Sequence, residues 1–336
     1  MESAIPPQLS VPRTRHPRVP DDYEPWFPSF VARHRTSVKR LVMAYLGTQE
    51  GRAPAWLDAA MSAPDGPRHH DLAVPAWPEP GGPRDIVAVG YWDDPAAFDR
   101  WFTRHREPWL SGGAGDGRWV EVVRPAVERY ETIFGRRSRP EGVAVLAAGF
   151  SGPVREHGYW GAMRDRMPAS QNDPLHDPGP VDVERRGDRA RVRPRGSVCL
   201  IRSGQDWSDS GGDERRAYLE VIEPALREGM DFLRDRGRGL GCLANRYLRV
   251  VDRAGRPAAR SYGAGWWRSM ADLERWAESH PTHLAIFSAF GRLAAARRDA
   301  LELRLYHEVA VAKPDEQWFE YVDCHPRTGL LAAAPD

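Results

Sequence analysis

Two histidines carry the chemistry that this chain could perform most directly. His307 alternates with apolar residues through residues 303–311, so it lies on the core-facing side of a predicted strand. His283 follows Pro281 in the first turn of a predicted helix. A buried imidazole without a partner costs on the order of 1 to 3 kcal/mol, so each ring needs a hydrogen bond or a ligand. Two interpretations stay open: a planar cofactor held between the rings, or two hydrogen-bonded core histidines.

Three further side chains are candidates for a site around these rings. Ser203 ends a predicted strand, where its hydroxyl could hydrogen-bond a ligand, although an ordinary turn serine explains it as simply. Arg166 counts for little by itself, because all but two of the 48 basic residues are arginines. Glu131 lies on a predicted strand, and its match with Glu320 in the internal repeat described below suggests a structural role common to both halves.

Composition excludes several classes of protein. The 336 residues are 41% hydrophobic, which is enough for a sizeable core. A net charge of +1 gives no field for gathering nucleic acid or acidic membrane. Cys199, Cys242 and Cys324 form no Cys-x-x-Cys pair, so neither a disulfide framework nor a zinc site is indicated. Without a signal peptide or an apolar segment of about 20 residues, we expect a cytoplasmic protein.

Part of the chain recurs after 175 residues. The shift superimposes six identical residue types, namely Gly90, Trp92, Ala96, Arg100, Trp101 and His105 on Gly265, Trp267, Ala271, Arg275, Trp276 and His280. Flanking segments match with other shifts, which pair Gly47 with Ser203, Arg118 with His307 and Glu131 with Glu320. We therefore predict an α+β fold of two fused halves, each an antiparallel sheet with helices on one face, whose two sheets pack into a barrel-like core.

The repeat divides the chain into four regions. Residues 1–35 form an N-terminal packing arm and residues 36–135 the first half. Residues 136–195 are an insert, with a strand expected at 143–148, and residues 196–336 form the second half.

The repeat also separates the histidines. His280 matches His105, which favours a helix-terminus role common to both halves. His283 matches Pro108, and His307 has no histidine counterpart either, so this pair belongs to the second half alone. That asymmetry is expected if only one half binds a cofactor.

The motifs that the sequence lacks restrict which cofactors the chain could bind. The sequence has no Gly-rich phosphate loop, no Gly-x-Ser-x-Gly elbow and no His-Glu-x-x-His motif, which disfavours nucleotide, hydrolase and zinc-protease chemistry. A single neutral imidazole on iron is the usual way to hold a non-covalent haem. Because no Cys-x-x-Cys-His occurs, any haem would be of the b type.

Six sequence blocks resemble the haem-containing aldoxime dehydratases, and the resemblance covers essentially the whole chain. The blocks are residues 156–161 (Glu-His-Gly-Tyr-Trp-Gly), 201–207 (Ile-Arg-Ser-Gly-Gln-Asp-Trp), 229–234 (Gly-Met-Asp-Phe-Leu-Arg), 279–283 (Ser-His-Pro-Thr-His), 305–309 (Leu-Tyr-His-Glu-Val) and 324–329 (Cys-His-Pro-x-Thr-Gly). The resemblance implies dehydration of R-CH=N-OH to a nitrile and water by a homodimer, with no nucleic-acid or membrane partner. It also implies a dimeric α/β barrel built of two ferredoxin-like halves.

The same resemblance implies roles for the candidate residues. His283 would be the axial ligand of a haem b that is ferrous in the active state and binds the substrate nitrogen. His307 would act on the hydroxyl of the substrate, assisted by Ser203 and Arg166, and Glu131 is implicated as well. The related chlorite dismutases and dye-decolorising peroxidases keep a haem peroxidase activity open as an alternative. A haem carrier or sensor, and a cofactor-free binding protein, are the others.

Overall fold

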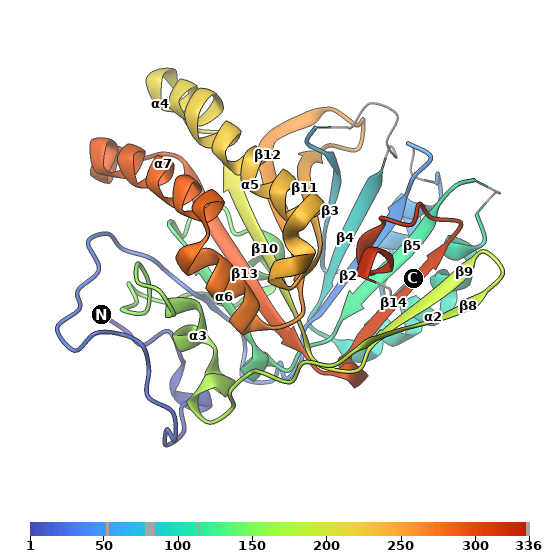
Figure 1. Ribbon diagram of the computed structural model, residues 1–336, viewed down its shortest axis with the longest axis horizontal. Coiled ribbons are helices and arrows are strands. Elements are labelled where there is room, and N and C mark those ends of the chain that lie inside the picture. The colour runs from blue at the N-terminus through green and yellow to red at the C-terminus, as the bar shows by residue number, and fades with distance from the viewer. Residues whose placement is uncertain (52–53, 78–84, 113–114, 334–336) are drawn as a thin grey trace.

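A twelve-stranded sheet forms the body of the protein (Figure 1). The computed structural model describes residues 1–51, 54–77, 85–112 and 115–333; the remaining residues fall within the ranges expected for the two halves. The strands are β2 (Val42–Thr48), β3 (His69–Pro75), β4 (Ile86–Trp92), β5 (Arg118–Val123), β6 (Tyr130–Phe134), β8 (Val181–Arg186), β9 (Arg189–Pro194), β10 (Val198–Asp206), β11 (Cys242–Val251), β12 (Pro257–Trp267), β13 (Arg304–Ala312) and β14 (Gln317–Val322). A separate pair joins β1 (Ala32–Arg33) to β7 (Gly149–Phe150).

Helices cover the outer face of this sheet. They are α1 (Leu57–Met61), α2 (Pro95–Leu110), α3 (Ala162–Arg166), α4 (Gly212–Ala217), α5 (Glu223–Arg236), α6 (Met270–Ser279) and α7 (Pro281–Arg297). The shorter turns are η1 (Pro7–Leu9), η2 (Val127–Arg129), η3 (Gly142–Leu146), η4 (Pro168–Gln171), η5 (Tyr218–Ile222), η6 (Gly237–Leu240), η7 (Arg298–Ala300), η8 (Pro314–Glu316) and η9 (Gly329–Ala333). α1 and α2 pack on β2, β4 and β5, whereas α5, α6 and α7 pack on the strands around β10 and β13. No helix of the described ranges is long and apolar enough to cross a membrane.

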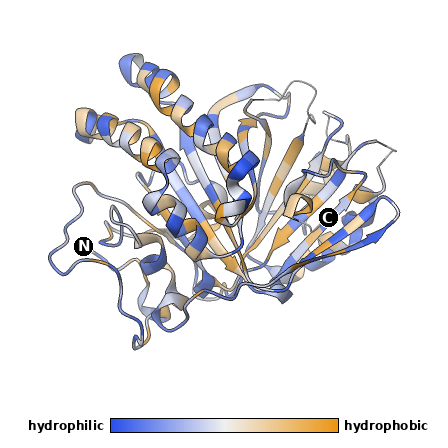
Figure 2. Ribbon diagram, viewed as in Figure 1, coloured by the Kyte–Doolittle hydropathy of each residue, from blue (hydrophilic) through white to orange (hydrophobic). Residues whose placement is uncertain are grey.

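The strands run in the order β6-β13-β10-β12-β11-β3-β4-β2-β5-β14-β9-β8, and neighbours are antiparallel. We predicted two sheets packed together, and this is wrong: pairing of β11 with β3 joins them edge to edge. The single sheet curls, because Trp266 on β12 packs against Tyr45 on β2 and Phe319 on β14. Its edge hairpin β8–β9 is rich in charged side chains (Figure 2), which discourages pairing with other strands.

A glycine and an aromatic residue fix how the two parts of the sheet correspond. Gly47 lies opposite Trp119 in the β2–β5 pair, and Gly204 lies opposite Tyr306 in the β10–β13 pair. In both places a Cβ atom on the glycine would collide with the aromatic ring, so only glycine fits. Gly47 therefore corresponds to Gly204, and the predicted match with Ser203 is wrong by one residue.

The corrected register changes three of the predicted matches. Ser203 and His307 lie opposite each other and correspond to an apolar pair, Leu46 and Val120, so the match of His307 with Arg118 is also wrong. Glu131 lies opposite Val309, and the corresponding place opposite Val122 is held by Trp318. Glu131 thus has no glutamate counterpart, which removes the main argument for a purely structural role.

Two local predictions also fail. His280 is a helix-terminus residue, since its side chain accepts from the N–H of Thr282 at the start of α7, but His105 lies inside α2. The apolar run 143–148 is not a strand: it lies mostly in η3, where the Val143 N–H donates to the carboxylate of Glu308 at 2.9 Å. Local bonds hold this turn, from the N–H of Ala144 to Glu141 and from that of Ala147 to Ala144, and the N–H of Ala148 bonds to Arg33 of β1.

Buried Glu121 ties distant strands together across the inside of the sheet. Its carboxylate accepts two hydrogen bonds from Arg246 at 2.7 and 2.8 Å, and one each from Trp266 and Tyr321 at 2.8 Å. Removing one partner of a buried ion pair typically costs about 3 to 5 kcal/mol, because the other charge stays buried and unpaired. We expect Glu121→Ala to lower the free energy of unfolding by about that amount in urea titration. The exposed Glu228→Ala is the control, and a loss below about 1 kcal/mol for Glu121→Ala would contradict the prediction.

Two buried histidines predict acid sensitivity. The ring nitrogens of His34 and His157 are buried without hydrogen-bond partners in the described part of the chain. Burial lowers the pKa of each from 6.5 to about 4, so both rings are neutral in the folded state and charged in the unfolded state between these values. As the pH falls from about 6.5 to about 4, the free energy of unfolding should decrease by up to about 1.4 kcal/mol per proton and pH unit. Urea titrations at several pH values across this range measure the free energy of unfolding. His34→Gln should reduce the slope of this free energy against pH by the contribution of one proton, and an unchanged slope would refute the low pKa of His34.

Candidate active site

Ser203 and His307 lie side by side on the helix-covered face of the sheet. They are directly opposite in the β10–β13 pair, so their side chains point to the same side. Ser203 lies inside β10 rather than at its end, because the glycine that follows it is needed beside Tyr306 and does not mark a turn. His307 shares a face with Val309 and Val311, as predicted, but these two valines are buried under the helices whereas His307 is half-buried.

The helices leave the middle of this face uncovered. Cys199 and Val309 are buried, and so is Leu303 at the other end of β13. Between these ends, Ser203 and His307 are only half-buried, and the side chain of His307 is 26% exposed. A polar pair is thus partly exposed between two buried apolar clusters.

Arg166 and Glu131 hold the ring of His307 from the side. The guanidinium of Arg166 lies 2.7 Å from Nε2 of His307 through Nη2, and its Nε donates to Oε2 of Glu131 at 2.6 Å. Oε1 of Glu131 lies 3.2 Å from the same Nε2. Burial raises the pKa of Glu131, but the nearby charges of Arg166 and His307 outweigh it and keep the pKa below the ordinary value. Nε2 of His307 therefore contacts both the anionic carboxylate of Glu131 and the permanently charged guanidinium of Arg166.

These contacts decide which ring atom of His307 faces a ligand. A guanidinium only donates hydrogen bonds, so Nε2 accepts from Arg166 when the ring is neutral and carries its proton on Nδ1. When the ring is protonated, Nε2–H can instead donate to Glu131. Within the described residues Nδ1 of His307 makes no hydrogen bond, so Nδ1 is the atom left for a substrate.

His283 presents an unshared nitrogen. It lies in the first turn of α7, as predicted, where Pro281 and the His280 cap start the helix. Its Nδ1 donates to the carbonyl oxygen of Ala277 at 2.6 Å, which leaves the lone pair of Nε2 free. Burial lowers the pKa of His283 to about 4, the bond to Ala277 opposes this, and the proximity of His307 lowers it further. Within the described residues Nε2 of His283 makes no hydrogen bond, and a neutral imidazole with a fixed tautomer and a free Nε2 is suited to bind a metal.

The surroundings of His283 fit a large flat cofactor. Trp276 and Trp160 pack on its ring with centroids 4.7 and 5.9 Å away. Trp160 also packs on Phe287, and both are partly exposed, as is Leu284. Large apolar side chains left open around one free imidazole match the needs of a porphyrin bound by a single histidine.

One segment of the insert reaches both histidines. Trp160 contacts the ring of His283, and six residues later Arg166 contacts His307. The turn between them depends on Gly161, which has φ of +101° and lies where a Cβ would collide with Arg18. In the sequence this block stood out only by its resemblance to a known family, and Trp160 was given no role. The two glycines that flank Tyr-Trp were the sequence feature that could have indicated a tight turn here.

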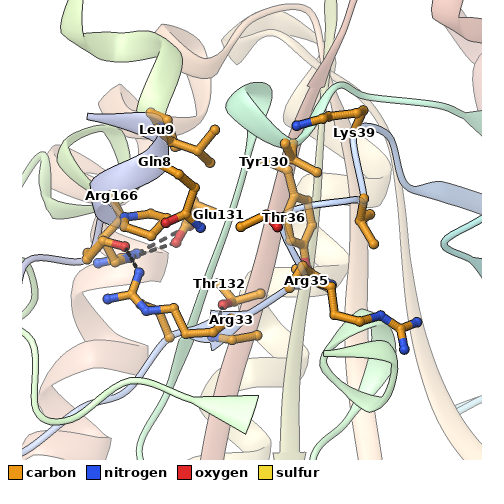
Figure 3. Close-up of a pocket in the computed structure, with 18 residues that line it drawn as sticks. Gln8, Leu9, Arg33, Arg35, Thr36, Lys39, Tyr130, Glu131, Thr132 and Arg166 are labelled. Carbon is orange, nitrogen blue, oxygen red and sulfur yellow. Dashed lines mark hydrogen bonds and ion pairs between the residues drawn. The ribbon is translucent and has the colours of Figure 1, made fainter. Parts of the chain in front are cut away.

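A cavity of about 130 Å³ lies behind the Glu131–Arg166 pair. Figure 3 shows both side chains on one wall, joined by hydrogen bonds, with Thr132 and Arg33 beside them and Lys39 at the other end. Residues Ala4, Pro6, Gln8 and Leu9 of the N-terminal arm form another wall. His283, His307 and Ser203 do not line this cavity. This cavity therefore adjoins Glu131 and Arg166 but reaches neither His283 nor His307.

The comparisons with known proteins identify the family of the chain. Residues 49–330 match the family described as haem-containing dehydratase, and the chain belongs to that family. The chain is 44% identical over 352 residues to an aliphatic aldoxime dehydratase of Pseudomonas chlororaphis, covering 99% of each protein. It is 31% identical over 334 residues to a phenylacetaldoxime dehydratase of Bacillus sp. (strain OxB-1), covering 93% of each.

Solved structures lead to the same family. A crystal structure of an aldoxime dehydratase superimposes with a TM-score of 0.90 at 43% identity, covering 98% of both chains. A second aldoxime dehydratase, crystallised in complex with butyraldoxime, also gives a TM-score of 0.90 at 43% identity, covering 98% of this chain and 96% of the other.

Proposed function

We propose that the chain dehydrates aldoximes, R-CH=N-OH, to nitriles and water. The observation that carries the proposal is the His307 ring, held at Nε2 by Arg166 and Glu131 and placed beside Ser203. Such a ring can give a proton to a leaving hydroxyl and then take one back. Full-length similarity to aliphatic aldoxime dehydratases at 43–44% identity supports the substrate class.

His283 would hold the cofactor through Nε2. We propose a non-covalent haem b, ferrous in the active state, because the family binds haem and the chain has no Cys-x-x-Cys-His. When bound, it would supply an iron site for the oxime nitrogen and electron density toward the N–O bond.

His307 would act first as acid and then as base. Nδ1–H of the protonated ring donates its proton to the oxime oxygen, so that water leaves instead of hydroxide. The ring is then neutral with its remaining proton on Nε2, facing Glu131, and its Nδ1 accepts the proton from the oxime carbon as the C≡N bond forms. The ring ends as it began, and the overall change is the loss of one water.

The neighbouring side chains would orient this proton transfer. Ser203 lies on the same face as His307 and would hydrogen-bond the oxime oxygen. Arg166 and Glu131 would keep the ring in place, with Glu131 accepting Nε2–H whenever the ring is charged. Positioning of this kind is typically worth about ten- to a hundredfold in rate per group.

Nitrile formation tests the function directly. The purified protein is reduced with dithionite without air and given butyraldoxime or phenylacetaldoxime, and the nitrile is measured by gas chromatography. We expect nitrile from the reduced protein and much less from the oxidised protein. The ratio of the two substrates decides between aliphatic and arylalkyl preference.

The same preparation distinguishes the alternatives. Oxidation of a dye by peroxide without nitrile formation would favour a haem peroxidase or chlorite dismutase-like enzyme. Rapid haem transfer to apomyoglobin without turnover would favour a carrier or sensor, and a colourless protein would favour a cofactor-free binding module.

We also propose an assembly for the chain. Residues 36–135 and 196–336 would be two ferredoxin-like halves of a dimeric α/β barrel, with residues 1–35 as an arm and 136–195 as an insert. The matching glycine and aromatic pairs of the two strand sets support this division. We propose a cytoplasmic homodimer, and the free thiols of Cys199, Cys242 and Cys324 agree with a reducing compartment. Light scattering on the haem-loaded protein measures the mass.

A further inference from the structure

The N-terminal arm follows the segment of the insert that carries Arg166. In Figure 1 the start of the chain lies beside α3. Residues 2–23 bond to residues 153–172 at many points along both segments, through Glu2 to Pro153, Ala4 to Glu156, Val11 and Thr14 to Gln171 and Asn172, Arg18 and Val19 to Asp165, and Tyr23 to His157. Such contacts between segments far apart in sequence restrict where α3 can lie.

Asp165 is one anchor of the arm. Its side chain is 2% exposed, and Oδ2 accepts from the backbone N–H groups of Arg18 at 2.8 Å and Val19 at 3.0 Å. The hydroxyl of Tyr159 donates to the same oxygen at 2.8 Å. Three donors on one buried carboxylate oxygen fix the residue that directly precedes Arg166.

Glu156 is the second anchor. Its carboxylate accepts from the N–H of Ala4 at 3.0 Å and the hydroxyl of Ser3 at 3.2 Å. Its backbone carbonyl accepts from Nη1 of Arg166 at 2.7 Å. The arm therefore holds a residue that in turn holds the guanidinium.

We infer that the arm positions Arg166 against His307, and that Asp165 and Glu156 are the positioning residues through which it acts. Arg166 uses every edge of its guanidinium: Nε and Nη2 meet Glu131, Nη1 meets Glu156, and Nη2 meets His307. A shift of the segment relative to the sheet would disturb the contacts of Arg166 with both Glu131 and His307, because these two residues lie on the sheet and Arg166 does not. The inference rests on the proposed function only for its effect on rate.

The test compares variants of the full-length haem protein. We expect Asp165→Asn to lower kcat by about ten- to a hundredfold with little change in KM, since a small displacement of a positioning group costs about that much. Glu156→Ala keeps the carbonyl group but removes the anchor for the arm, and should act in the same direction if Asp165→Asn folds poorly. Asn172→Ala is the matched control: it removes a contact of the arm to Thr14 at 2.8 Å that does not involve Arg166, and its kcat should stay within about twofold.

A double-mutant cycle separates positioning from general damage. Adding Asp165→Asn to Arg166→Ala should cause almost no further loss, because the group to be positioned is already absent. Losses that multiply, or a normal kcat in both Asp165→Asn and Glu156→Ala, would overturn the inference.

Hydrogen exchange gives a readout that does not depend on nitrile formation. Amides of residues 156–166 should exchange faster in Asp165→Asn than in the unsubstituted protein, and at the unchanged rate in Asn172→Ala. Unchanged exchange in Asp165→Asn would refute the anchoring even if the chain catalyses another reaction. Faster exchange with no nitrile from the unsubstituted protein would refute the proposed function and keep the anchoring.

Discussion

His307→Ala should purify with a full complement of haem and form nitrile at least about a thousandfold more slowly than the unsubstituted protein, since acid–base catalysis by one group is worth about 10² to 10⁴. The loss follows from the geometry, because His307 is the residue directly opposite Ser203 on the neighbouring strand. Haem binding should survive, because His283 is anchored independently by Ala277. The measurement is kcat under anaerobic reduction, together with the visible spectrum.

The control removes an imidazole that lies elsewhere. His105 lies within α2, stacked on Trp56 at 6.0 Å on the other helix layer, so His105→Ala should keep both haem and turnover. If the haem-replete His307→Ala variant turned over at the normal rate, His307 would not be the acid. Loss of haem in that variant would mean that the ring supports the cofactor as well.

Strand alternation placed His307 correctly because it depends only on local geometry. Side chains two apart share a face, and Val309 and Val311 show which face is covered. Local geometry could not predict that Ser203 lies beside His307, because the two residues come opposite each other only through the pairing of β13 with β10. The comparison of residue types between the two parts of the chain gave a register that was wrong by one residue, because loops of unequal length obscure the alignment. An error of one residue places a side chain on the opposite face of the sheet.

The positions of Glu131 and Arg166, the other two candidate residues, could not be predicted from local sequence patterns. Glu131 lies on β6, which leaves its own part of the chain and pairs with β13 some 170 residues later. Arg166 lies on the five-residue α3 within an irregular insert, in a chain where arginine is common. Only the resemblance to a family singled out these two residues, and only the structure shows that both reach the same nitrogen of His307.

The two parts of the sheet differ where the candidate site lies. Where one part has Leu46 beside Val120, the other has Ser203 beside His307. Where α2 runs through Pro108 without a break, the matching helix stops at His280 and α7 begins with Pro281, which brings His283 into a first turn. Two polar residues in place of apolar ones on a strand pair, together with one break in a helix, thus distinguish the second half of the chain from the first.

His283→Ala should yield protein that binds haem at under about a tenth of the normal stoichiometry, because one histidine is the only protein ligand that a b-type haem of this kind would have. The apolar wall of Trp160, Trp276 and Phe287 would remain but offers no lone pair to iron. Absorbance in the Soret region per chain and the pyridine haemochrome measure this, and added imidazole should restore part of the binding by filling the space left by the ring. His105→Ala again serves as the control. A His283→Ala variant with normal haem content would show that the iron is held from elsewhere, and would exclude Nε2 of His283 as the ligand.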